Sequence, residues 1–102
     1  MEKFLCMSKH LFPNINDDDW RKGGLSIEAS SALSAAIDFV HKYPDEAGVE
    51  MLPFNESNKL FIWVKHLSGG YVIGVFVTIF AEYRITSASE NCYVMGGGNA
   101  PV

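Results

Sequence analysis

The chain has 102 residues, of which 48% are hydrophobic and 20% charged, and its net charge is −4. This length fits one domain with its own core, and the composition is that of a globular protein, not of a disordered one. The charge balance argues against direct nucleic-acid binding, because neutralising phosphates requires clustered lysine and arginine.

The N-terminal segment predicts a short strand followed by a loop. Residues 4–7 are apolar, and Pro13 ends whatever precedes it because proline has no amide donor. Residues 14–19 are rich in asparagine and aspartate, which favour turns, so Asp17, Asp18 and Asp19 are expected in a solvated loop. A calcium loop of the EF-hand type is excluded, since the glycine and glutamate that it requires at its sixth and twelfth positions are missing. The tryptophan that follows, Trp20, beside three carboxylates is typical of an interface anchor with a charged rim.

The clearest helix is predicted over residues 26–43. Ser26 can cap its N-terminus, and a buried stripe follows the spacing of one helix face. The stripe consists of Ala29, Leu33, Ala36, Ile37 and Val40. Pro44 is expected to close the helix, with residues 44–48 forming a turn that carries Asp45 and Glu46.

The second half of the chain predicts a meander of strands. Residues 49–54 suggest a short edge strand because Pro53 lies within them. Residues 60–67 and 71–80 flank a glycine-bearing turn, which indicates a β-hairpin. Residues 71–80 are apolar at both even and odd positions, so this strand should lie inside a sheet with both faces covered. The second cover could be the N-terminal segment with Phe12 and Trp20, a dimer mate or a partner protein.

Beyond residue 80 the pattern weakens. Residues 83–86 alternate apolar and polar side chains, which indicates a strand with one solvent-exposed face. Residues 87–91 suggest a turn, and residues 92–95 suggest a last short strand. Residues 96–102 have no apolar period and are expected to form a flexible tail. The predicted fold is therefore one α+β domain over residues 1–95. It has a mainly antiparallel sheet of four to five strands and one principal helix on one face.

No catalytic, metal-binding or cofactor-binding pattern emerges from the sequence. Cys6 and Cys92 have no zinc-type spacing and are expected to be buried free thiols. The histidines, His10, His41 and His66, lie on three different elements. No secretory signal is visible and no apolar run reaches the roughly 20 residues of a membrane span, so the cytoplasm is the expected location.

The missing chemistry and the acidic middle of the chain favour a binding protein over an enzyme. Residues 23–58 carry six acidic residues and one basic residue. Such a protein suits a basic partner, as an immunity protein or antitoxin suits a nuclease-type toxin. The candidate contacts are Asp17, Asp18, Asp19, Trp20, Asp45 and Glu46. A structural module that forms homo-oligomers through its sheet, and a small-ligand-binding domain, remain open alternatives.

Overall fold

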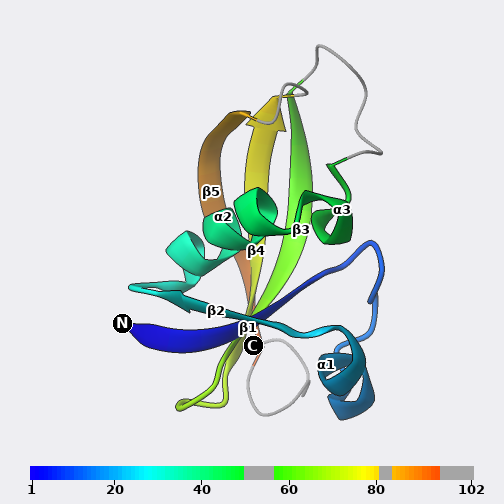
Figure 1. Cartoon of the computed structure of the whole chain (residues 1–102), viewed down its shortest axis with the longest axis vertical. Helices are drawn as coiled ribbons and strands as arrows, with labels where there is room; N and C mark the ends of the chain where they lie inside the picture. Colours follow the sequence, from blue (N-terminus) through cyan, green and yellow to red (C-terminus); the bar gives the residue numbers. More distant parts are fainter. Residues whose placement is uncertain (50–56, 81–83, 95–102) are drawn as a thin grey trace.

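The computed structural model describes residues 1–49, 57–80 and 84–94, with side-chain positions for residues 1–49, 58–79 and 88–89. The elements in chain order are β1 (Glu2–Ser8), α1 (Asp17–Gly23), β2 (Leu25–Ala29), α2 (Ala32–Lys42), α3 (Pro44–Ala47), β3 (Ser57–His66), β4 (Val72–Phe80) and β5 (Arg84–Val94). The strands form one five-stranded sheet in the order β2-β1-β3-β4-β5, and every pairing is antiparallel (Figure 1). The predicted α+β class, the antiparallel sheet and the principal helix are confirmed.

The hairpin formed by β3 and β4 is the longest regular pairing, and it matches the sequence prediction. Its register runs from Ser57 opposite Phe80 to Lys65 opposite Val72. The turn closes through Gly70, whose N–H donates to the carbonyl of His66 at 2.8 Å. Gly70 has a φ of 71°, a left-handed conformation that glycine adopts without steric cost.

The prediction that β4 is buried on both faces holds fully for one face. Its odd-numbered side chains are buried under α2: Ile73, Val75, Val77 and Ile79. On the other face Val72 is buried in a cluster with Trp20, whereas Phe76 and Thr78 are only partly buried. Of the three covers considered for the second face, the N-terminal segment is present, and it covers one end of that face.

The helix predicted to begin at Ser26 begins later, and this part of the prediction is wrong. Leu25–Ala29 forms edge strand β2 instead, paired with β1. Helix α2 starts at Ala32, and the hydroxyl of Ser31 caps it by accepting from the N–H of Ser34 at 3.1 Å. Apolar and polar residues alternate over Leu25–Ala29, which is the pattern of a strand, but five residues are too few to outweigh Ser26 as a candidate helix cap.

Helix α2 packs closely on the sheet because its inner face is mostly alanine (Figure 1). The buried positions are Ala32, Ala35, Ala36, Phe39 and Val40. Leu33 and Ile37, both expected in the buried stripe, are partly exposed, because the face that α2 turns to the sheet is centred on Ala35, Ala36 and Phe39.

Three further predictions differ from the structure. Asp17–Gly23 is a short helix, not a loop, and Pro44–Ala47 is one helical turn, not an open turn. The turn predicted at 87–91 is absent from the described chain, because β5 continues through it with two shifts of register against β4. The strand predicted at 49–54, apart from Val49, and the tail at 96–102 lie outside the described residues.

Candidate functional site

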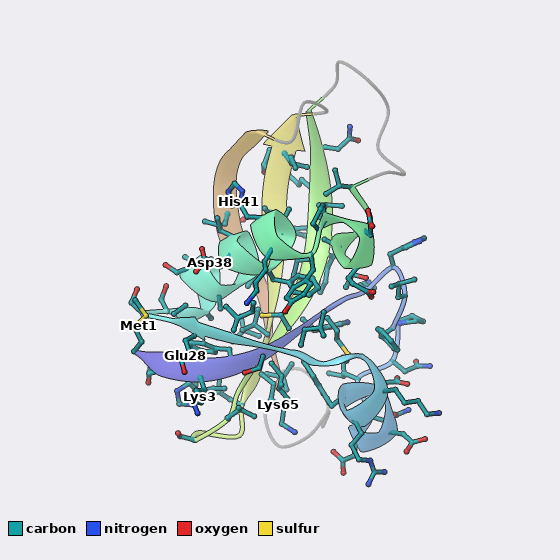
Figure 2. All side chains as sticks on the ribbon, viewed as in Figure 1. Met1, Lys3, Glu28, Asp38, His41 and Lys65 are labelled. Carbon is teal, nitrogen blue, oxygen red and sulfur yellow. The ribbon has the colours of Figure 1, made fainter. Side chains whose placement is uncertain are left out.

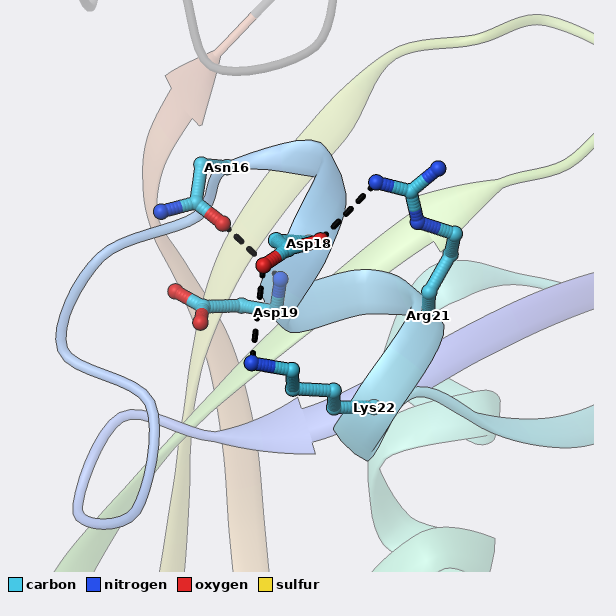
Figure 3. Close-up of polar contacts among 5 residues, drawn as sticks. All are labelled: Asn16, Asp18, Asp19, Arg21 and Lys22. Carbon is cyan, nitrogen blue, oxygen red and sulfur yellow. Dashed lines mark hydrogen bonds and ion pairs between the residues drawn. The ribbon is translucent and has the colours of Figure 1, made fainter.

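The three aspartates of the N-terminal segment form the first turn of α1. Asn16 caps this helix by accepting from the backbone N–H of Asp19 at 2.8 Å (Figure 3). Carboxylates at a helix N-terminus complement the positive end of its dipole, so part of the acidic run serves the local fold. Asp18 also contacts Arg21 at 2.9 Å and Lys22 at 3.4 Å (Figure 3). The charge of α1 is thus largely balanced within the helix.

Trp20 is buried, with 4% of its surface exposed. It joins Met7, Trp63 and Val72 in a cluster on the face of the sheet opposite α2. The side chain therefore anchors α1 to its own sheet, and the sequence-based hypothesis that Trp20 anchors a partner does not fit this position. An indole that already fills a core cannot insert into a pocket on another protein unless α1 moves.

Asp45 and Glu46 form the first turn of α3, and both are exposed. Helix α3 follows α2 directly, and Gly48 ends it with a φ of 89°. The six residues predicted from the sequence thus divide into two groups. Asp45 and Glu46 lie with the α2 layer, whereas the α1 group lies with the cluster on the opposite face of the sheet.

The structure adds a groove that the sequence did not predict. It has a volume of about 570 Å³ and lies between the edge strand β2 and helix α2. Its lining residues are Ser26, Ile27, Glu28, Asp38, His41 and Lys42. Figure 2 shows Asp38 and His41 on α2, with Glu28 on the strand beside it. The sequence does not predict the groove, because it predicts residues 26–28 as helix, whereas they form the strand β2 that makes one wall of the groove.

Charge is unevenly distributed around this groove. Helices α2 and α3 together carry Asp38, Asp45 and Glu46 against one lysine, Lys42. Three other lysines lie over aromatic rings elsewhere: Lys9 over Phe61, Lys59 over Phe76 and Lys65 over Trp20. Folding therefore separates the charges, and the helical layer is more acidic than the opposite face.

Two buried polar side chains of the described chain, Cys6 and His66, serve the fold. Burial, reinforced by the charge of Asp38, raises the pKa of the Cys6 thiol far above its usual range, so this cysteine is an unreactive core residue. His66 is buried, and both of its ring nitrogens have partners. Its Nε2 lies 2.8 Å from the Glu2 carboxylate, and its Nδ1 accepts from the N–H of Gly69. The side chain of Cys92 lies outside the described positions.

The described residues contain no group of three or more side chains suited to hold a metal ion. None of the helices in the described ranges is long and apolar enough to cross a bilayer. Comparison with protein-family models, with curated proteins and with solved structures finds no match to this chain. The groove and the charge of the helical layer are therefore the features of the described residues that bear on function.

Proposed function

We propose that this chain is a small acidic binding protein that inhibits a basic protein partner by occlusion, as an immunity protein or antitoxin neutralises a nuclease-type toxin. The observation that carries the proposal is the acidic helical layer of α2 and α3 beside an open groove. Carboxylates arranged on a rigid surface can occupy the positions that substrate phosphates take on a basic protein.

The helical layer is a better contact surface than α1, although both are acidic. Asp38, Asp45 and Glu46 are exposed, and among the described ion pairs none involves these three residues. In α1, Asp18 contacts two cations of its own helix, and the three aspartates share the helix with two basic residues. The three carboxylates of α2 and α3 have one lysine among them, and a larger excess of negative charge attracts a basic partner more strongly.

The test compares two triple variants with the same change in net charge. One neutralises the helical layer, Asp38→Asn with Asp45→Asn and Glu46→Gln, and the other neutralises α1, Asp17→Asn with Asp18→Asn and Asp19→Asn. Candidate partners are the basic products of neighbouring genes, selected first by whether co-expression of this chain relieves the growth arrest that they cause.

We expect the helical-layer variant to associate about tenfold more slowly at low salt and to lose most of its salt dependence, since steered association depends on such charges. The α1 variant should associate at close to the original rate. Equal association rates for both variants and the unchanged chain would contradict the proposal, as would the failure of every basic neighbour to be neutralised.

A further inference from the structure

The open edge of the sheet at β2 carries unpaired backbone groups, and the pairing of β1 shows which ones. The N–H of Lys9 donates to the carbonyl of Phe61, and the carbonyl of Lys3 accepts from the N–H of Leu67. Odd-numbered residues of β1 therefore direct their backbone groups toward β3. Because backbone groups alternate along a strand, the even-numbered residues direct theirs toward β2.

The same alternation continues into β2. Glu28 lies opposite Lys3, and Ser26 lies opposite Leu5. Since both partners direct their backbone groups away from β2, these are non-hydrogen-bonded pairs, and the N–H and C=O groups of Ser26 and Glu28 point to the open edge. In the described part of the chain, the backbone of Ser26 or Glu28 makes no hydrogen bond to the backbone of a loop or helix. Both residues line the groove beside α2.

The two edges of the sheet differ in how they are protected. The ladder between β5 and β4 has two shifts of register, which are typical of an edge that avoids further pairing. The ladder between β2 and β1 has regular register, and Leu25–Ala29 contains neither lysine nor proline. Its shortness and the charge of Glu28 are the features of β2 that oppose pairing with another strand, and the charge opposes a basic strand least.

We propose that an extended segment of the basic partner adds to β2 as a sixth strand and lies in the groove against α2. This inference rests on the proposed function and names the way in which the partner binds. Backbone hydrogen bonds to Ser26 and Glu28 supply register, and a lysine or arginine of the segment reaches Asp38 across the groove. Strand addition of this kind combines backbone pairing with side-chain contacts for specificity.

A second copy of this chain is a poorer occupant of the edge. Pairing of two β2 strands would bring Glu28 of both copies into one interface, with Asp38 of each copy on the helix beside it. Like charges at such distances destabilise a strand pair. The groove has two carboxylates, Glu28 and Asp38, against one lysine, Lys42, and this acidic excess favours a basic segment over self-association.

The probe is a blocked hexapeptide that alternates lysine with valine, titrated into the isotopically labelled full chain and followed by backbone amide shifts. A peptide that alternates glutamate with valine is the charge control. We expect saturable shifts at Ser26, Ile27, Glu28 and Asp38 with the lysine peptide, and at least about tenfold weaker binding of the glutamate peptide.

The deciding variant is Ser26→Pro, which removes the outward N–H and leaves the pairing with β1 intact. Proline is tolerated on an edge strand whose N–H faces outward, so the fold should survive. Ser26→Ala is the matched control, because it removes the hydroxyl and keeps the N–H. We expect Ser26→Pro to weaken peptide binding at least about tenfold and Ser26→Ala to change it less than twofold. Glu28→Pro with Glu28→Gln repeats the comparison if Ser26→Pro does not fold.

Several outcomes would overturn strand addition. Shifts that map away from β2, no saturable binding in the millimolar range, or equal binding by the proline and alanine variants would each do so. A molecular mass that rises with protein concentration, together with amide shifts in β2 that change on dilution, would assign the edge to a second copy of the chain. If Ser26→Pro still neutralises the partner as well as Ser26→Ala, strand addition fails while the proposed inhibition stands.

Discussion

The two faces of the sheet are built differently, although the same strands form both. Under α2 lies a large cluster of closely packed aliphatic side chains, alanines and Phe39. On the α1 side the buried hydrophobic cluster of the described residues has four members: Met7, Trp20, Trp63 and Val72. Rings at its margin, such as Phe61 and Phe12, are partly exposed. The difference indicates that the α2 face carries most of the stability, and that α1 is a thinner cover.

Buried polar groups without a hydrogen-bond partner occur on both faces of the described sheet. On the α2 face the amide nitrogen of Asn58, which lies opposite Ile79, is one of them. On the α1 side, the indole nitrogens of Trp20 and Trp63 are buried without a hydrogen-bond partner. Each unpaired buried donor costs about 1–3 kcal/mol. The buried residues of the α2 face are nearly all apolar, and the thiol of Cys6 reaches the carbonyl of Ala35 at 3.7 Å. The face that presents the acidic groove thus has the larger buried core, which suits a preformed binding surface.

The same truncation on each face tests this comparison most strongly. Phe39 is fully buried on α2, and its replacement in Phe39→Ala should lower the free energy of unfolding by about 3–5 kcal/mol. Phe61 is partly exposed on the other face, so Phe61→Ala should cost less than about 2 kcal/mol, in proportion to the smaller buried area. Urea unfolding followed by circular dichroism measures both. Equal losses would show that the two faces contribute alike.

The sequence predicted the α2 face better than the α1 face, for physical reasons. The hairpin of β3 and β4 is encoded locally, by alternating residues on either side of a turn that needs glycine. The helix was also visible, but its start was misplaced because Ser26 and Ser31 are both acceptable caps. Only the pairing of β2 with β1, a contact between distant residues, decides between them.

The candidate site could be predicted only in part. Asp45 and Glu46 were identified from charge and are exposed, as a contact residue must be. Two interpretations of Trp20 follow from the sequence, an interface anchor beside three aspartates and a cover for the second face of the sheet, and the structure has it in the cover. Its burial depends on Met7 and Trp63, which the sheet brings to it from elsewhere in the chain. A signal was present in α1, since Asn16 followed by acidic and then basic residues is the pattern of a capped helix.

Stability at alkaline pH tests the dry core of the α2 face. The folded state raises the pKa of the Cys6 thiol far above its usual range, because burial disfavours the thiolate. In the unfolded chain the thiol ionises near its ordinary pKa of about 8.5. Above that pH the unfolded state loses a proton that the folded state keeps, so stability falls by about 1.4 kcal/mol per pH unit.

The measurement is the difference in unfolding free energy between pH 7.5 and 9.5, with Cys92→Ser as the background. Adding Cys6→Ala should remove about 1.4 kcal/mol of the decline, because one pH unit of the range lies above the ordinary thiol pKa. Other groups titrate equally in both proteins and cancel in the comparison. An identical decline in both would mean that water reaches Cys6 in the folded state.

The smallest effect is expected from removing an indole nitrogen on the α1 side. Trp20→Phe and Trp63→Phe each delete a buried donor that has no partner, which is favourable, and some ring volume, which is unfavourable. The two contributions are similar in size, so each variant should change the free energy of unfolding by less than about 1 kcal/mol. Thermal and urea unfolding, followed by the fluorescence of the remaining tryptophan, measure the change. A loss above about 2 kcal/mol would contradict this balance and show that the indole makes a hydrogen bond after all.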